Sequence, residues 1–205
     1  MTRSEGGATR QRGAGTRARI LAAAVDLFAE QGYDSTTVQQ VVDRAGTTKG
    51  GLYHHFSSKE EILYELYHGV FATMLTQLEQ ILAQGSDPES ALRAVIDSAV
   101  SSTAESLKVT AVFAQEVNRV DPQRFKQLQD DWRRYQDSVR ELIRSAQQSG
   151  RFAATASPEV ISWAIFGVTN SMPTWFRPDG PKSAADIAAE LADLIINGLD
   201  PKEPA

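Results

Sequence analysis

The side chains best suited to recognising another molecule lie between Thr36 and Leu63, in the string TTVQQVVDRAGTTKGGLYHHFSSKEEIL. Gly46 separates two short helical segments, and the second one begins with Thr48-Lys49-Gly50-Gly51. A lysine reaches guanine acceptors or phosphate, and small residues at a helix tip let the backbone approach base edges closely. A helix-turn-helix places its second helix in the major groove. The segment therefore indicates contact with double-stranded DNA.

Three further side chains near this tip suit the phosphate backbone of DNA. Tyr53 and His54 follow on the expected outward side, where a phenol and an imidazole donate hydrogen bonds to phosphate oxygens. Lys59 opens the next helix, where its charge and the free N–H groups both suit a phosphate. A plainer interpretation stays open, in which Tyr53 covers the helix junction, Lys49 is solvated and His55 packs in a partly buried position.

The spacing of apolar residues predicts the helices that position this tip. A first helix is predicted over residues 16–32, with one apolar face formed by Ile20, Ala24, Leu27 and Phe28. Thr36 and Gln39 have the spacing of a capping box at the start of a second helix. Ser58 and Glu61 repeat that spacing at the start of a long helix that ends near residue 84.

Later breaks and apolar stripes predict five more helices, at about residues 88–104, 107–120, 121–150, 158–176 and 183–199. The helix at 121–150 carries a lengthwise apolar seam that is expected to pack within its own domain: Phe125, Leu128, Trp132, Tyr135, Val139, Leu142 and Ala146. No strand pattern is present. The sequence therefore predicts an all-α fold of about nine helices, with a three-helix helix-turn-helix head at residues 16–60 and a six-helix body for ligand binding and dimerisation at 61–200.

The charge is divided unevenly along the chain. The net charge is −5, yet residues 1–60 hold eight Lys or Arg and six Asp or Glu, whereas residues 61–205 hold thirteen and twenty. Residues 1–19 alone carry five Arg against one Glu. This asymmetry indicates a head that faces DNA and an acidic body. Residues 1–15 are expected to form a disordered basic arm. It is either a flexible end without a role or an arm that runs along the phosphates of DNA or enters a minor groove.

Several classes of protein fit the sequence poorly. There are no cysteines, which fits a reducing compartment and removes thiol chemistry and the usual zinc ligands. The N-terminus has no apolar core for a signal peptide, and no apolar run reaches the roughly 18 residues that span a bilayer. Three histidines at 54, 55 and 68 form no catalytic or metal-ligating set with other residues. We therefore expect a cytoplasmic protein with no membrane partner, no cofactor, no bound metal and no enzymatic activity.

The string GTTKGGLYHHF at 46–56, followed by SKEE at 58–61, resembles the signature of the tetracycline-repressor (TetR) family. The likeness covers about residues 16–64 closely, and beyond them only the order and lengths of the helices. The resemblance implies an Ω-shaped homodimer on a palindromic operator. By position it implies phosphate contacts from Thr37, Tyr53, His54 and Lys59, and base-side contacts from Thr48, Lys49 and Gly51. Thr47 stands where the family usually has an aliphatic residue.

The same resemblance implies a pocket for a small-molecule effector in the body. Its expected lining is a set of large apolar or amphipathic side chains: Phe113, Glu116, Trp132, Trp163, Phe166, Asn170 and Trp175. Ordinary core packing is the alternative for each aromatic residue. The turn at 174–181 is similar to that of a family branch that senses acyl-CoA thioesters, in which Arg177 would help hold an anionic group. A structural turn with a surface arginine is the alternative.

Two hypotheses for function follow, and a third is weighed against them. The helices at about 158–176 and 183–199 are expected to pair with a second copy of the chain as a four-helix bundle. The leading hypothesis is a homodimeric repressor that an effector, such as an acyl-CoA or another apolar metabolite, releases from its operator. The alternative is a constitutive DNA-binding regulator with a filled core. The third, an enzyme, lacks a recognisable catalytic constellation.

Overall fold

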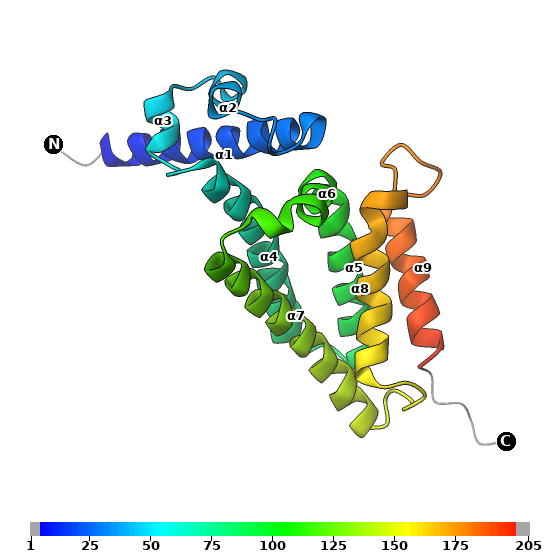
Figure 1. Cartoon of the computed structure of the whole chain (residues 1–205). Helices are drawn as coiled ribbons and strands as arrows, with labels where there is room; N and C mark the ends of the chain where they lie inside the picture. The colour runs from blue at the N-terminus through cyan, green and yellow to red at the C-terminus, as the bar shows by residue number, and fades with distance from the viewer. Residues whose placement is uncertain (1–4, 200–205) are drawn as a thin grey trace. The chain divides into compact units, whose positions relative to one another are not determined.

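The computed structural model describes residues 5–199, with only the backbone of residues 5–14 and of Val117. Every regular element in this range is helical, as predicted, and Figure 1 shows their order. The helices are α1 (Glu5–Gln31), α2 (Val38–Ala45), α3 (Lys49–Tyr53), α4 (Lys59–Ala83), α5 (Pro88–Glu105), α6 (Leu107–Glu116), the 3₁₀ turn η1 (Val117–Arg119), α7 (Pro122–Gln148), α8 (Pro158–Trp175) and α9 (Ala184–Asn197). No described helix is both long and apolar enough to cross a membrane.

The chain divides into two compact units. The first contains the described residues up to Gly69 together with residues 111–125, and the second contains residues 70–110 and the described residues from 126 onward. The first unit therefore extends past the expected end of the DNA-binding head at residue 60. It also takes in the second half of α6, η1 and the first residues of α7.

Within the first unit, α1 packs against α2 and α3. Helix α1 ends where Gly32 adopts a positive φ of 84°, a conformation that glycine reaches without steric cost. The shared core contains Ile20, Phe28, Val41, Leu52 and Phe56, all of them buried. The predicted apolar face of α1 is thus confirmed, and it forms the support on which α2 and α3 lie.

Two predictions about this unit need correction. Helix α1 begins at Glu5, well before the expected start at Thr16, so the part of the proposed arm from Glu5 onward is helical backbone. Residues 1–4 of the arm lie outside the described residues. The capping box at α2 is formed one position later than expected, by Thr37 and Gln40. Thr36 is 1% exposed and donates its hydroxyl to the carbonyl of Gly32 at 2.8 Å, so it fixes the preceding turn instead.

The segment from α6 to α7 makes polar contacts with the rest of the first unit. The Arg119 guanidinium donates to the Asp34 carboxylate at 2.5 Å and lies 3.4 Å from the Glu116 carboxylate. The Asp121 N–H donates to the Glu60 carboxylate at 2.8 Å. These contacts connect the end of α6 with the loop that precedes α2 and with the first turn of α4.

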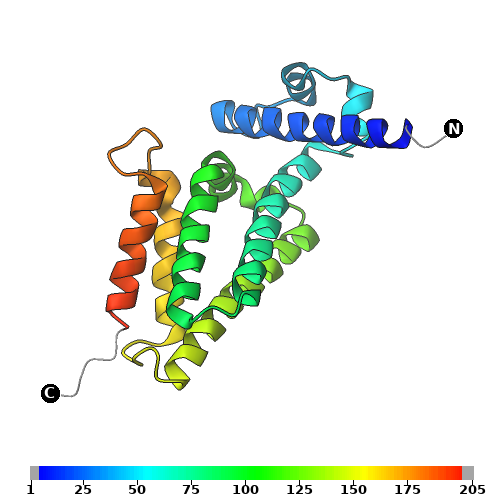
Figure 2. The ribbon, with the colours of Figure 1, turned by 180° about the vertical axis from the view of Figure 1, so that it is seen from behind.

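The second unit is built on α5, α8 and α9, which run side by side in Figure 1 and Figure 2, and α5 contacts both of the others. Val139 and Ile143 of α7 join Ile96 of α5 and Ile165 of α8 in its core, all of them fully buried. The seam residues Tyr135, Val139 and Ala146 therefore pack within the second unit, as predicted, whereas Phe125 belongs to the first unit. Asp87 and Ser157 cap the starts of α5 and α8, and each is followed by a proline that suits the first helical position.

Candidate nucleic-acid interface

Local hydrogen bonds at both ends define the geometry of α2. The Thr37 hydroxyl oxygen accepts from the Gln40 N–H at 3.2 Å, and the Gln40 side-chain oxygen accepts from the Thr37 N–H at 2.7 Å. At the other end Gly46 takes the left-handed conformation, with φ of 59°. The N–H of its neighbour Thr47 donates to the carbonyl of Val42 at 3.1 Å. Local hydrogen bonds thus cap both ends of the helix.

Helix α3 is a single short helix whose outer side is bare. Thr48 is its N-cap, and its side chain accepts from the Gly51 N–H at 3.0 Å. Lys49, Gly50 and Tyr53 are exposed, and Tyr53 retains 53% of its surface. Among the described residues, no hydrogen bond or ion pair engages the Lys49 ammonium. The exposed side of α3 therefore presents a free cation, a phenol and a stretch of open backbone.

The family resemblance implied a base-side contact from Gly51, but Gly51 is engaged within the turn. Its N–H is taken by Thr48, and a Cβ added to it would lie 2.7 Å from the Thr47 hydroxyl. Gly50 differs, since a Cβ there would meet only the Thr48 hydroxyl, at 3.9 Å. Gly51 thus leaves room for the turn, whereas Gly50 is the glycine of the exposed tip.

The two histidines after α3 have different surroundings. His54 is exposed, and its ring lies edge-on to that of His55 with the centroids 5.1 Å apart. His55 is half-buried and lies 6.4 Å from the ring of the buried Phe56. The packing alternative for His55 therefore holds, and His54 remains the histidine available to an outside partner.

Lys59 opens α4, as predicted, but its ammonium has partners that the sequence did not predict. Its ammonium donates to the carbonyls of Tyr33 at 2.6 Å and Thr36 at 2.8 Å, and lies 4.0 Å from the centre of the Tyr33 ring. Burial lowers the pKa of this ammonium. Two of its three N–H groups are thus committed to the loop between α1 and α2. The geometry gives Lys59 the role of holding that loop against α4.

The residues expected to line an effector pocket do not come together in one cavity. Phe113 and Glu116 belong to the first unit, where the Phe113 ring lies edge-on to Tyr67 at 4.5 Å. Trp132 and Phe166 belong to the second unit, in contact with each other at 5.1 Å between ring centroids. The other four lie on the surface: Trp163, Asn170, Trp175 and Arg177. Helical periodicity had identified amphipathic positions but not which side of α8 faces the core.

The outer side of α8 is apolar and exposed. Trp163 is 59% exposed and Val160 also faces outward, with Ala164 and Gly167 continuing the same side of the helix. On α9, Leu194 is 72% exposed. Exposed aromatic and aliphatic side chains grouped on adjacent elements are typical of surfaces that meet another protein.

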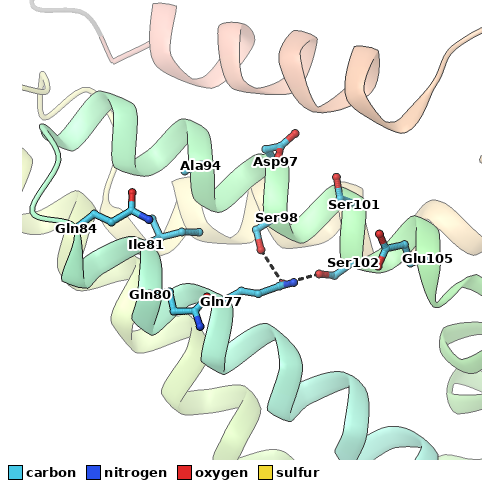
Figure 3. Close-up of a pocket in the computed structure, with 10 residues that line it drawn as sticks. All are labelled: Gln77, Gln80, Ile81, Gln84, Ala94, Asp97, Ser98, Ser101, Ser102 and Glu105. Atoms are coloured by element: carbon cyan, nitrogen blue, oxygen red, sulfur yellow. Dashed lines mark hydrogen bonds between the residues drawn. The ribbon is translucent and has the colours of Figure 1, made fainter. Parts of the chain in front are cut away.

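The second unit holds a cavity that sequence reasoning missed, a groove of about 340 Å³ between α4 and α5. Figure 3 shows Ser98 and Ser102 of α5 pointing toward Gln77 of α4, whereas Asp97 and Ser101 point away from α4. The groove is lined by Gln77, Gln80, Ile81, Gln84, Ala94, Asp97, Ser98, Ser101, Ser102 and Glu105. Most of these side chains are polar, so they belong to no apolar stripe. Their recurrence every three or four residues on both helices was the signal that would have grouped them.

A short two-helix turn that leads into a bare, basic-tipped helix defines the class of helix-turn-helix DNA-binding proteins. The family model described as "Bacterial regulatory proteins, tetR family" matches residues 20–66, and "Tetracyclin repressor-like, C-terminal domain" matches residues 85–199. The chain belongs to the TetR family of DNA-binding transcriptional regulators.

Individual relatives are similar to this chain over nearly its whole length. The HTH-type transcriptional repressor KstR2 of Rhodococcus jostii is 27% identical over 186 residues, which cover 90% of this chain and 91% of the relative. The TetR-family regulator PfmR of Thermus thermophilus is 32% identical, with a TM-score of 0.81 and coverage of 89% and 100%. AibR, solved with isovaleryl coenzyme A and operator DNA, shares the fold at a TM-score of 0.76 and 22% identity, with coverage of 88% and 98%.

Proposed function

We propose that the chain represses transcription by binding a palindromic operator as a homodimer, and that a small-molecule effector releases it. The observation that carries the proposal is the bare outer side of α3, with Lys49 unengaged and Gly50 and Tyr53 exposed. Lys49 and the hydroxyl of Thr48 would contact base edges, because both lie at the N-terminal end of the helix that enters the groove. The relative KstR2 is named a transcriptional repressor, which supports repression.

The phosphate contacts are assigned to three side chains at the edges of this surface. Thr37, Tyr53 and His54 are exposed and carry groups that donate to phosphate oxygens. Lys59 is left out of this group, because its ammonium is committed to two loop carbonyls. Gly51 is assigned the role of accommodating Thr47 instead of contacting a base.

Two substitutions distinguish base contacts from phosphate contacts. Operator sequences would be selected from a random pool with the purified chain, and affinity measured by fluorescence anisotropy on the selected site and on random DNA. Lys49→Ala is expected to weaken operator binding more than random binding, since a good base contact contributes about 1–3 kcal/mol of discrimination. Tyr53→Ala is expected to weaken both equally. Equal losses for Lys49→Ala on the two DNAs would refute its base-reading role.

The dimer interface is assigned to the outer side of α8 together with α9. Two α8–α9 pairs would form a four-helix bundle across a two-fold axis and bury the apolar groups that each copy exposes. Trp163→Arg is expected to convert the dimer to a monomer in analytical ultracentrifugation, because it places a charge in the centre of the proposed bundle. Leu82→Arg is the matched control, since Leu82 is also an exposed apolar residue but lies on α4. A Trp163→Arg protein that remains dimeric would exclude this interface.

The effector is proposed to be an acyl-CoA or a similar apolar metabolite with an anionic group. The support is the turn after α8, where the exposed Arg177 is available to an anion, and the likeness to AibR, whose solved complex holds isovaleryl coenzyme A. Acetyl-, isovaleryl-, octanoyl- and palmitoyl-CoA would be titrated into the operator complex. Release by at least one of them below high-micromolar concentration is expected, and its loss in Arg177→Gln would support the assigned role.

One observation favours the second candidate, a constitutive regulator without effector. The aromatic side chains inside the second unit already pack on one another. Trp132 stacks on Tyr135 at 5.8 Å with the planes 8° apart, and Phe166 closes edge-on against Trp132. If no acyl-CoA releases the operator, this filled interior makes the constitutive regulator the better account.

A further inference from the structure

The groove between α4 and α5 has the properties of a second ligand site, separate from the DNA-binding surface. It lies wholly inside the second unit and has a volume of about 340 Å³, within the range of small-molecule sites. Only Ile81 and Ala94 of its lining are apolar. The apolar stripes of the same two helices, with Leu78 and Val95 as members, are buried in the core. The sides of the two helices that line the groove are therefore mostly polar.

The floor of the groove is held in one arrangement by hydrogen bonds. The Gln77 side-chain oxygen accepts from the Ser98 hydroxyl at 2.9 Å and from the Ser102 hydroxyl at 2.8 Å, shown as dashed lines in Figure 3. Ser102 is 9% exposed, whereas Ser98 and Gln77 are half-buried. Because the oxygen accepts from both hydroxyls, the amide NH₂ of Gln77 is left as a donor, with no acceptor among the described residues. A ligand oxygen on this floor would accept from that NH₂ group.

The charged residues that line the groove are acidic. Asp97 and Glu105 are exposed carboxylates on α5, and no ion pair to another described residue engages either one. No Lys, Arg or His lines the groove. The two carboxylates are two helical turns apart, which places them about 12 Å from each other along the axis. An anion such as a CoA phosphate is disfavoured here, whereas a cation meets two unneutralised carboxylates.

We propose that this groove binds a small ligand of the amino-sugar class, one that carries both ammonium and hydroxyl groups. Its ammonium groups would pair with Asp97 and Glu105, and a hydroxyl or ring oxygen would accept from Gln77. Gln80 and Gln84 line the α4 side, where amides both donate and accept. The site is open and its carboxylates are solvated, so binding is expected to be weak, in the range of about 1 mM or somewhat tighter, and weaker at high salt.

The test is calorimetric titration of the full chain with the glucosamine disaccharide produced by deacetylating chitobiose. Chitobiose itself is the matched neutral ligand, and spermidine is a cation without hydroxyl groups. The deacetylated disaccharide is expected to bind at least about tenfold more tightly than either. The double variant Asp97→Asn/Glu105→Gln should lose about tenfold or more of that affinity. The charge-matched control Glu79→Gln/Glu190→Gln alters two exposed carboxylates outside the groove and should change it less than twofold.

Three results would overturn the proposal. They are no detectable binding of the deacetylated disaccharide at about 10 mM, equal binding of chitobiose or spermidine, and equal losses in the two double variants. Thermal unfolding of each variant without ligand shows whether it is folded. A folded groove variant that keeps full affinity counts against the site. Since the titration needs neither DNA nor acyl-CoA, its outcome is independent of the proposed operator binding and effector release.

Discussion

Replacing Lys59 by alanine separates a structural role from a DNA contact. The substitution removes the N–H donors to the carbonyls of Tyr33 and Thr36 and the cation above the Tyr33 ring. An unsatisfied buried carbonyl costs about 1–3 kcal/mol, and a partly exposed cation–π contact contributes about 0.5–1 kcal/mol. Water reaches part of this loop, which reduces the carbonyl cost. We therefore expect the free energy of unfolding of the first unit to fall by about 2 kcal/mol.

The assay must report on the first unit specifically. The three tryptophans, at 132, 163 and 175, lie outside the helix-turn-helix, so their fluorescence does not follow it. Hydrogen exchange of the α2 amides, followed by mass spectrometry, measures its opening directly. In parallel, operator affinity is measured against salt concentration, where each phosphate contact contributes about 0.9 to the slope of log affinity against log salt.

We expect faster hydrogen exchange in α2 and an unchanged salt slope of operator affinity for Lys59→Ala. Lys49→Ala is the comparison, because the Lys49 ammonium is exposed and its loss should leave α2 exchange unchanged. A Lys59→Ala protein with normal exchange in α2 and a slope lower by about 0.9 would refute the reasoning. It would restore Lys59 to the phosphate contacts that the sequence predicted.

Three further predictions concern the same unit. Gly50→Ala should stabilise α3 by about 0.5–1 kcal/mol, since the added Cβ meets only one atom, at 3.9 Å. The same substitution should weaken operator binding by about tenfold or more, and a variant that binds as tightly as the parent would show that the exposed glycine is dispensable. Hydrogen bonds from the hydroxyl and N–H of Ser57 lower the pKa of Glu61, so the stability they contribute is present above the ordinary carboxyl pKa of 4.5 and is lost as the pH falls below it. In urea unfolding, the free energy of unfolding of Glu61→Gln should therefore decline less between pH 5 and pH 3 than that of the parent, and an equal decline would contradict this. Gly69→Ala, inside α4 with nothing within 4 Å of the added Cβ, should raise the stability of α4 by about 0.5–1 kcal/mol in thermal unfolding, and a loss would reveal a close contact or a need for glycine there.

Local rules predicted the DNA-binding head well because its helices are defined by nearby residues. Ile20, Leu27 and Phe28 occupy the buried face of α1 that their spacing indicated, and the Ser58 hydroxyl accepts from the Glu61 N–H at the start of α4, as expected of a cap. The predicted cap of α2 was wrong by one residue: Thr36 and Thr37 both suit an N-cap, but the Thr36 hydroxyl donates to the carbonyl of Gly32 and Thr37 is the cap.

The candidate residues of the body were harder to predict. A helix with two apolar sides, such as α8, does not reveal from its sequence which side packs on the core. Trp163 and Phe166 lie three residues apart on α8, yet one is exposed and the other is 2% exposed. Lys59 shows the same limit in the head. Its charge suggested a phosphate, but the fold brings two carbonyls from a loop more than twenty residues away to the same ammonium.

The central claim, that the bare side of α3 reads a palindromic DNA site, is tested most directly by selecting a site from random duplex DNA. The selected site would then be compared with its half-site and with a scrambled duplex by anisotropy. We expect a two-fold symmetric site bound by two chains, preferred over scrambled DNA by at least about a thousandfold. We also expect that Lys49→Ala lowers that preference. Enrichment of no sequence, or a preference untouched by Lys49→Ala and Gly50→Ala alike, would contradict the claim.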